Sequence, residues 1–368
     1  MNLTLFSPDV PGAPGGVSDH TLALARAIAG RGAAVSVLAG RGDAARFAPI
    51  PCRVGVGPGP YGGRDLADAL AEAGADQVLV QYVPFLYARL GVAPRLVAAL
   101  RRVRRAGVRI AVFVHEPFVP FTRLPWLLTG GPQRAQLRAV LRLADRAYAP
   151  VPAWVARLSR WTGGRVPVTL APVGATLPVS GLSRDAARAR LGLQCDETAI
   201  GVFSPGANAF RQDWLAESWR AALPSPATRW VLFGNGSTAL GARLAGPTVT
   251  TLGTLPPTEI ADVMRAMDLA LAPYRDGLTL RRTAAMLALA HGVATVSSTG
   301  HLWDPSLGAL ARCPDTAAAF VVDVAALVSD PAGRAALGAA GLDGYRRTAS
   351  VEALADILLR DLHPLEAA

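Results

Sequence analysis

The chain alternates short apolar runs rich in β-branched residues with longer stretches rich in Ala, Leu and Arg. This alternation is typical of βαβ units around a parallel sheet, whose strands are buried on both faces and are joined by helices. In the first half, helices are expected at Val17–Gly30 and at about Pro94–Arg105. The predicted strands of this half are Asn2–Phe6, Ala34–Leu38, Val78–Tyr82, Arg109–Val114, Asp145–Ala149 and Val168–Ala171.

A segment rich in turn formers, Pro172–Pro178, ends this half, and the strand pattern then restarts. The later stretch Ser350–Leu362 has helical periodicity and can cross back to the first half. We therefore predict an α/β protein of two Rossmann-like, doubly wound parallel-sheet domains that face a central cleft. The domains are residues 1–172, joined by 350–368, and residues 173–349. The predicted strands of the second half are Ile200–Phe203, Trp230–Phe233, Thr248–Leu252, Leu269–Ala272 and Ala294–Ser297.

The composition of the 368 residues fits two folded domains. Apolar residues make up 51% and charged residues 17%, which supplies a buried core and argues against disorder. No run approaches the roughly 18 uncharged apolar residues of a membrane span, and the start of the chain lacks the basic segment of a signal peptide. We expect a cytoplasmic protein. Cys52, Cys195 and Cys313 lie far apart, in no metal or redox spacing, and are expected to be buried thiols.

All 37 basic residues are arginines, against 27 acidic residues, and the net charge is +10. With the abundance of Ala, Gly and Pro, this bias indicates a GC-rich genome. Nucleic-acid binding is not expected, because the arginines are scattered and lack the aromatic interleaving of a single-strand groove. The positive balance still favours anionic partners, either phosphates or a membrane surface.

One group of arginines recurs every four residues, at Arg134, Arg138, Arg142 and Arg146, and predicts a helical stripe. The apolar, aromatic segment Phe118–Leu128 precedes it. Two interpretations remain open. The stripe is either a solvated helix face beside a packed loop, or a peripheral contact with the inner face of an anionic membrane, where a lipid-linked acceptor is presented.

Glycine-bearing loops follow several predicted strands. Gly15 and Gly16 lie between the first strand and first helix, where backbone N–H groups can meet a ligand closely. Gly206 and Arg211 follow the first strand of the second half, and Arg211 suits a bidentate contact with a diphosphate. The loop Phe233–Ser237 is expected to contribute shape. The alternative for the loop of Gly15 and Gly16 is a plain βα turn, and the alternative for Arg211 is a solvent-facing arginine at the start of a helix.

The strongest constellation is the loop after the strand Leu269–Ala272. It carries Asp276, Gly277 and Thr279, and Arg281 and Arg282 are expected to open the next helix. A hydroxyl and two guanidinium groups at a helix N-terminus form a cradle for two phosphates. The alternative, an exposed basic helix start, does not explain why the arginines coincide with a strand-end loop.

A histidine, His115, follows the strand Arg109–Val114 directly. As a neutral imidazole it can hydrogen-bond a sugar hydroxyl, and as a cation it can offset charge on a leaving phosphate; it can also be structural. Glu116 and Asp19 are candidates for contacts with a sugar or an acceptor. His20 and His291 fall within helical stretches and are expected to be packing or surface residues. The sequence contains no cluster of His, Cys or carboxylate residues with metal-binding spacing, so neither a divalent cation nor another cofactor is expected.

These motifs resemble the GT-B glycosyltransferases of family 4, and the resemblance covers nearly the whole chain. Its most specific part runs from Asp268–Tyr274 to Leu289–Gly292. The other matching motifs are Gly15–Val17, Arg31-Gly32, His115–Pro117, Val231–Gly236 and Leu252-Gly253.

The resemblance implies a retaining glycosyltransferase that uses a nucleotide-sugar donor without a metal. The second domain would hold the nucleoside diphosphate and the first an acceptor, which is a carbohydrate, a lipid-linked molecule or a small molecule. Gly16 would contact the donor phosphates or the acceptor, and His115 the sugar. Arg211 and the turn of Thr279, Arg281 and Arg282 would neutralise the departing diphosphate.

The sequence departs from the family pattern at two points. The family has two glutamates eight residues apart; Asp276 stands near the first, whereas the second region reads Ala284-Ala-Met-Leu. The chain also has no lysine for the family's arginine–lysine pair. Alternative functions are therefore a catalytically weakened or inactive GT-B scaffold, and a nucleotide-sugar hydrolase or epimerase of the same fold.

Overall fold

The structure is a computed structural model that describes residues 2–12, 15–59, 63–122, 124–204, 206, 209–222, 227–244 and 246–362. Its contacts divide the chain into two compact units, Met1–Val173 with Val351–Ala368, and Gly174–Ser350. Each unit has its own sheet and its own apolar core. The two-sheet α/β architecture predicted from the alternating pattern is confirmed.

The sheet of the first unit contains seven strands within the described residues, all parallel, in the order β3-β2-β1-β4-β5-β6-β7. The strand order reverses between β1 and β4, which is where ligands bind in doubly wound sheets, beyond the carboxyl ends of the strands. The strands are β1 (Asn2–Asp9), β2 (Ala34–Arg41), β3 (Cys52–Arg53), β4 (Gln77–Tyr82), β5 (Arg109–Val114), β6 (Arg146–Ala149) and β7 (Val168–Leu170).

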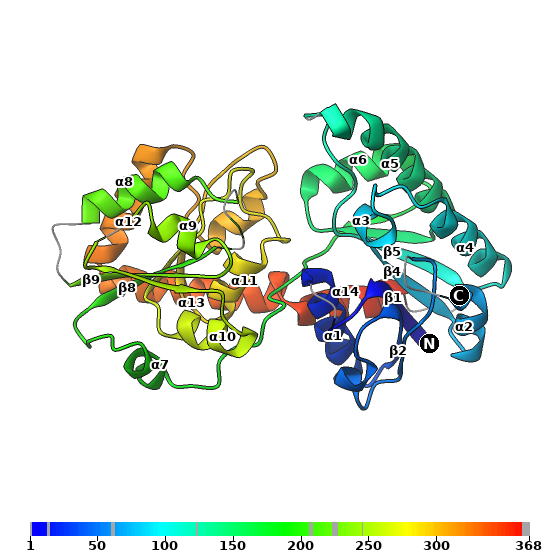
Figure 1. The fold of residues 1–368 in the computed structure, drawn as a ribbon, viewed down its shortest axis with the longest axis horizontal. Helices are drawn as coiled ribbons and strands as arrows, with labels where there is room; N and C mark the ends of the chain where they lie inside the picture. Colours follow the sequence, from blue (N-terminus) through cyan, green and yellow to red (C-terminus); the bar gives the residue numbers. More distant parts are fainter. Residues whose placement is uncertain are drawn as a thin grey trace. The chain divides into compact units, whose positions relative to one another are not determined.

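Helices cover both faces of this sheet (Figure 1), because successive side chains of a strand point to opposite faces. In β5, Ile110 and Val112 join a core with α2, α4, α5 and α6, whereas Ala111 and Phe113 join a core with α1 and α14. The helices are α1 (Gly16–Ala29), η1 (Ala44–Phe47), α2 (Leu66–Glu72), α3 (Pro84–Tyr87), α4 (Pro94–Arg105), α5 (Leu124–Leu143), α6 (Pro152–Thr162) and α14 (Val351–Leu362).

The helix α14, far away in sequence, belongs to the core of this first unit. Leu354 and Leu358 are fully buried beside α1 and the sheet. Arg31 pairs with Asp356 and donates to the Glu352 carbonyl at 2.7 Å. Apolar burial and this charged contact together attach α14 to α1.

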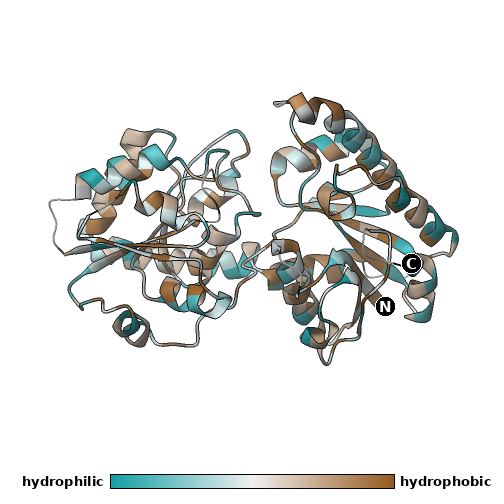
Figure 2. Cartoon of the chain, viewed as in Figure 1, coloured by the Kyte–Doolittle hydropathy of each residue, from teal (hydrophilic) through white to brown (hydrophobic). Residues whose placement is uncertain are grey.

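The sheet of the second unit has five parallel strands within the described residues, in the order β10-β9-β8-β11-β12. Both sheets are mostly apolar, as expected for strands covered on two faces (Figure 2). The strands are β8 (Thr198–Phe203), β9 (Thr228–Phe233), β10 (Val249–Gly253), β11 (Leu269–Leu271) and β12 (Ala294–Val296). The helices are α7 (Arg184–Arg190), α8 (Gln212–Ala222), α9 (Ser237–Gly241), α10 (Pro257–Arg265), α11 (Thr283–Ala290), η2 (Pro305–Ala309), α12 (Ala317–Ser329), α13 (Pro331–Gly344) and η3 (Tyr345–Ala349).

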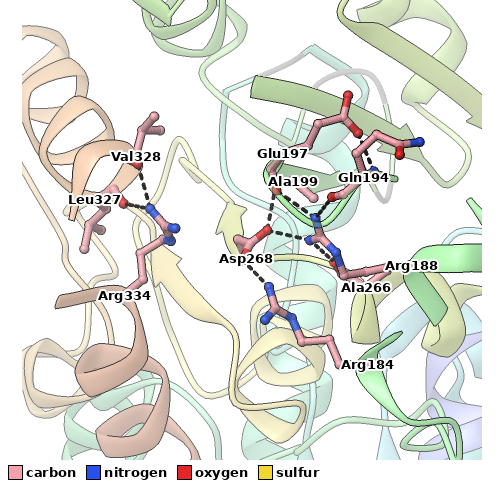
Figure 3. A network of polar contacts seen from close by, with 10 residues as sticks. All are labelled: Arg184, Arg188, Gln194, Glu197, Ala199, Ala266, Asp268, Leu327, Val328 and Arg334. Carbon is pink, nitrogen blue, oxygen red and sulfur yellow. Dashed lines mark hydrogen bonds and ion pairs between the residues drawn. The ribbon is translucent and has the colours of Figure 1, made fainter. Parts of the chain in front are cut away.

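An ion-pair network connects α7 to the start of β11 (Figure 3). Arg188 is only 6% exposed and donates to Asp268 at 2.8 Å and to the carbonyls of Gln194 and Glu197 at 2.6 and 2.7 Å. Asp268 also pairs with Arg184 and accepts from the Ala199 backbone N–H at 2.8 Å. Each buried charge therefore has a partner, which offsets its desolvation.

Two expectations from the sequence are wrong. Arg146 does not extend the arginine stripe, because α5 ends at Leu143 and Arg146 begins β6, where its guanidinium lies 3.8 Å from Asp361.

The cysteines are not all buried thiols. Cys195 is exposed, because it lies in the loop between α7 and β8, while Cys52 and Cys313 are half-buried. Burial raises the pKa of the Cys52 thiol to about 11 and that of Cys313 to about 12. Within the described chain, no helix combines the length and apolarity that crossing a membrane requires.

Candidate active site

The loop after β11 is held in place by the loop that follows β12. Leu278 donates its backbone N–H to Ser298, and its carbonyl accepts from Asp304, both at 3.0 Å. Gly277 has a φ of +97°, and a Cβ there would lie 2.8 Å from the Cβ of Trp303. Only glycine fits this turn, because of both its conformation and the close approach of the neighbouring loop.

The loop brings Asp276 together with the two predicted phosphate-binding arginines. Arg281 donates to the Asp276 carboxylate at 2.7 Å, and Arg282 pairs with its other oxygen. The guanidinium of Arg282 also stacks over the ring of Tyr274, 4.4 Å from its centroid. All three charged side chains are at most 20% exposed, so the cluster is a built arrangement with two positive charges against one negative charge.

The helix α11 begins at Thr283, and Arg282 is its N-cap residue with a non-helical backbone. The expectation that Arg281 and Arg282 open this helix is therefore wrong by one to two residues. Their backbone folds as a turn that brings both guanidinium groups back to Asp276. The hydroxyl of Thr279 is fully buried and has no hydrogen-bond partner among the described residues.

Arg211 lies beside the same loop. Its backbone N–H donates to Pro273 at 2.8 Å, and its guanidinium donates to the Arg275 carbonyl at 3.2 Å and stacks on Trp214. Gly206 has open space where a Cβ would be. Gly234, at the end of β9, has a φ of +91° and approaches the Ser204 carbonyl too closely for any other residue, which fits the shape role expected for its loop.

In the first unit, Gly15 and Gly16 begin α1 at the carboxyl end of β1. Gly15 is the N-cap with a φ of 145°, and a Cβ on either glycine would meet nothing within 4 Å. The space beside both glycines is therefore open, as expected for a place where a ligand can approach the backbone closely. Burial raises the pKa of Asp19 in this turn, and the nearby Arg46 partly opposes that rise.

His115 lies at the carboxyl end of β5, as expected, but it is buried and tightly held. Its Nε2 donates to the Oε1 of Gln81 at 2.6 Å. Its ring lies 4.8 Å from the ring of His20 and nearly perpendicular to it. Burial, reinforced by His20, holds the pKa of His115 well below its ordinary value, so the imidazole is neutral in this structure. This neutral form favours the hydrogen-bonding role over the cationic one.

The sequence analysis did not predict that His20 is buried in contact with the ring of His115. His20 is fully buried, and its Nδ1 donates to the Val173 carbonyl at 3.1 Å. Burial lowers the pKa of His20 to about 4, partly opposed by the Val173 contact. Its spacing with Leu24 and Ile28 on the apolar face of α1 is the signal that could have indicated this burial.

The remaining candidates differ in exposure. Glu116 is exposed. His291 is a packing residue at the end of α11; it donates to the Leu287 carbonyl at 2.8 Å and accepts from the Ser180 N–H at 3.0 Å. Ala284 is 5% exposed on a helix whose other residues, Thr283 apart, are also apolar and buried. In the described ranges, no three His, Cys, Asp or Glu side chains are grouped so that they could hold a metal ion.

Comparisons with known proteins agree with this architecture. The chain resembles sucrose-phosphate synthase from Thermosynechococcus elongatus, with a TM-score of 0.67 and 19% identity over 98% of this chain and 99% of that one. It also resembles HepE from Anabaena in complex with UDP, with a TM-score of 0.65 and 16% identity over 99% and 100% of the two chains. A third structure, WaaG, a glycosyltransferase of lipopolysaccharide biosynthesis, gives 0.63 and 13% over 98% and 100%. At these identities the likeness establishes the fold, which is that of the GT-B glycosyltransferases.

Residues 198–330 match the family model "Glycosyl transferases group 1". This segment runs from β8 past the end of α12 and contains the Asp276–Arg281–Arg282 cluster. Among curated protein sequences, none matches the chain. The chain therefore has the GT-B fold and contains a segment that matches the group 1 glycosyl transferases, and the predicted resemblance is confirmed at this level.

Proposed function

We propose that this glycosyltransferase moves a sugar from a nucleotide-sugar donor to an acceptor hydroxyl, with retention of the anomeric configuration and without a metal ion. The observation that carries the proposal is the cluster of Asp276, Arg281 and Arg282 at the start of α11, inside the matched segment. The HepE structures with UDP and with UDP-glucose support a nucleotide sugar as the class of donor. An acceptor held by the first unit, at a peripheral contact with an anionic membrane, is part of the proposal.

The arginine cluster suits a leaving diphosphate. A planar guanidinium can bind phosphate oxygens through two N–H groups, and Asp276 already fixes the orientation of both guanidinium groups. Preorganised charge of this kind stabilises developing negative charge without reorganising during the reaction. Among the described residues two arginines pair with one carboxylate, so these three side chains carry a net positive charge that suits a diphosphate.

We propose a same-face reaction, which gives retention in one step. The bond between the anomeric carbon and the phosphate oxygen breaks, and the acceptor oxygen forms its bond on the same face. The acceptor proton passes to an oxygen of the leaving phosphate. Neutral His115 keeps an unprotonated Nδ1, because its Nε2–H donates to Gln81, and this Nδ1 accepts a hydrogen bond from a hydroxyl of the transferred sugar.

Thermal-shift measurements on the full chain test the donor class. UDP, GDP, ADP and dTDP, and their sugars, are added with Mg²⁺ or with EDTA. A nucleotide at 100 times its dissociation constant adds about 2.7 kcal/mol to stability, which gives a visible rise in melting temperature. We expect a rise with one nucleotide that is the same in Mg²⁺ and EDTA and is lost in Arg282→Gln.

The matched control is Arg190→Gln, because Arg190 pairs with Asp262 in the same unit, away from the loop that holds Asp276. This variant should keep the full shift. A shift that needs Mg²⁺ would contradict metal independence. If no nucleotide shifts the wild-type protein, or if Arg282→Gln and Arg190→Gln behave alike, the proposed donor site is wrong.

One observation favours a second candidate, a GT-B binding protein with weakened or lost catalysis. Ala284 stands where the family has its second glutamate, and it is buried among apolar residues of α11, so no carboxylate is available at this position. Product analysis separates the possibilities. A glycosylated acceptor of retained configuration supports the transferase, free sugar or an altered nucleotide sugar supports a hydrolase or epimerase, and an unchanged donor that still binds supports the scaffold.

A further inference from the structure

Six arginines of the first unit, five on the helices α5 and α6 and one in the turn after α6, form a surface without acidic partners among the described residues. We call this group the α5–α6 arginine surface. Within the described residues, none of the six forms an ion pair with a carboxylate. Between residues 117 and 184 the only acidic residue is Asp145, and its carboxylate already pairs with Arg104 and accepts from the Ile110 N–H. The members are Arg134, Arg138, Arg142, Arg157, Arg160 and Arg165.

Part of this surface borders an open hollow of about 400 Å³, lined by Arg134, Arg157, Arg160 and Trp161. Burial, together with repulsion from nearby arginines, lowers the pKa of Arg134. Positive charges that crowd around a hollow without a counter-charge favour binding of an anion, because the anion would reduce the repulsion.

Aromatic rings hold these arginines in place. The guanidinium of Arg134 lies 3.9 Å from the ring centroids of both Phe118 and Phe121. Phe118 in turn stacks on Trp161, with ring centroids 5.5 Å apart. The guanidinium of Arg138 also lies over the Trp161 ring, 4.3 Å from its centroid. The arrangement is therefore built before any ligand arrives, and Phe118 follows His115 by only three residues.

Large apolar side chains are exposed at the start of the same helix. Leu124 is 77% exposed and Leu128 is 78% exposed, and Leu127 and Phe121 are each about half exposed. Exposed apolar side chains next to a basic hollow are the pattern of a helix that lies at a membrane interface. A soluble phosphate compound would need the arginines but not the leucines.

We propose that the α5–α6 arginine surface binds the phosphate group of an anionic lipid. Arg134, Arg157 and Arg160 surround the phosphate, and Leu124 and Leu128 enter the apolar layer. The inference deepens the acceptor side of the proposed function, because it places the first unit, which carries His115, against a lipid surface. It does not depend on the donor cluster in the second unit.

Flotation with vesicles tests the proposal on the full chain. Phosphatidylcholine vesicles are compared with vesicles that also contain phosphatidylglycerol. We expect flotation only with the anionic vesicles and less of it as salt is raised, because surface charges are screened. The double variant R157Q/R160Q should bind roughly thirtyfold more weakly, since each arginine near an anionic surface contributes about 1 kcal/mol to the free energy of membrane binding.

The matched control is R101Q/R105Q, which removes the same charge from exposed positions of α4. It should change the partition by less than about threefold, because these arginines only add to the general field. Leu124→Ser combined with Leu128→Ser should weaken binding by roughly tenfold or more. Equal flotation with neutral and anionic vesicles, or equal losses in R157Q/R160Q and R101Q/R105Q, would overturn the proposal.

Two further arms separate the remaining outcomes. If inorganic phosphate raises the melting temperature, if this rise is lost in R157Q/R160Q, and if no vesicle floats the protein, then the ligand is a soluble phosphate compound and the lipid proposal is wrong. The nucleotide-dependent shift is measured on the same variants and should be unchanged. If the wild-type protein shows no nucleotide-dependent shift, this would count against the proposed transferase, whereas flotation reports only on the lipid site.

Discussion

Two groups of arginines, one in each unit, have opposite surroundings. In the second unit, Arg188 is almost fully buried, and Asp268 and three backbone carbonyls accept all of its contacts. In the first unit, Arg157 and Arg160 are exposed around a hollow that no acidic residue lines. The Asp276 cluster lies between these extremes, with two arginines for one carboxylate.

This difference separates arginines that hold the fold from arginines that are available to a ligand. A buried guanidinium has lost its water and is stable only if the protein replaces that water completely. An exposed guanidinium with like-charged neighbours gains nothing from the fold, and its favourable interactions remain to be made with an anion. The number of carboxylates around each arginine thus indicates its role.

The largest effect is expected from removing the shared partner of the buried pair. Asp268→Ala leaves Arg188 charged and without its partner at a nearly dry site, so the free energy of unfolding should fall by about 3–5 kcal/mol. Urea unfolding of the second unit measures this. Arg190→Gln breaks a more exposed ion pair in the same unit and should cost less than about 1 kcal/mol. Equal costs for the two variants would show that burial does not set the role of these arginines.

An intermediate effect is expected at a buried base that has no charged partner, His20. Burial lowers its pKa from 6.5 to about 4, so as pH falls the unfolded chain binds a proton first. The stability present above pH 6.5 is therefore lost between pH 6.5 and about 4, by roughly 3 kcal/mol from this group. His115, whose pKa is also lowered, adds to the loss in the same direction.

The variant His20→Phe keeps a ring beside His115 and removes the titrating group. Its unfolding free energy, measured by urea titration from pH 8 to pH 4, should therefore fall less steeply than that of the wild-type protein. The slope is the informative quantity, because the substitution also removes the contact with Val173. Parallel curves would mean that His20 is not held neutral by burial.

The smallest effect is expected from the unpaired arginines. Arg157→Gln should change the free energy of unfolding by less than about 0.5 kcal/mol, with a slight gain at low salt because repulsion of Arg134 is relieved. The double variant R157Q/R160Q, which is expected to weaken vesicle binding, would then be as stable as the wild-type protein. A loss of 2 kcal/mol or more, on the scale of a buried pair, would mean that this surface serves the fold.

The sequence predicts the sheets well because their strands are continuous buried runs. All eleven strands expected from the pattern are present, and β5 and α4 have the predicted bounds. The two-residue strand β3 and the four-residue helix α3 were not predicted, because such short elements show no periodicity. Arg146 was placed on the helical stripe because spacing alone does not show where a helix ends.

The site is predictable only in part. Parallel strands end at one edge of a sheet, so the positions of Gly15 and Asp276 beyond strand ends follow from the pattern. The pairing of Asp276 with Arg282 does not, because a spacing of six residues brings side chains together only in the particular turn of this loop. The contact of His20 with Val173 joins residues 153 positions apart, and nothing local in the sequence encodes it.

The return of α14 to the first unit sets the order in which the chain can fold during synthesis. Residues Gly174–Ser350 are continuous, so the second unit can fold as soon as it leaves the ribosome. The first unit is translated earlier, yet Leu24 and its apolar neighbours on α1, which also pack on β1 and β2, stay partly uncovered until Leu354 and Leu358 arrive. The part of the protein made first is therefore completed last, and during translation it presents an apolar surface that chaperones can bind.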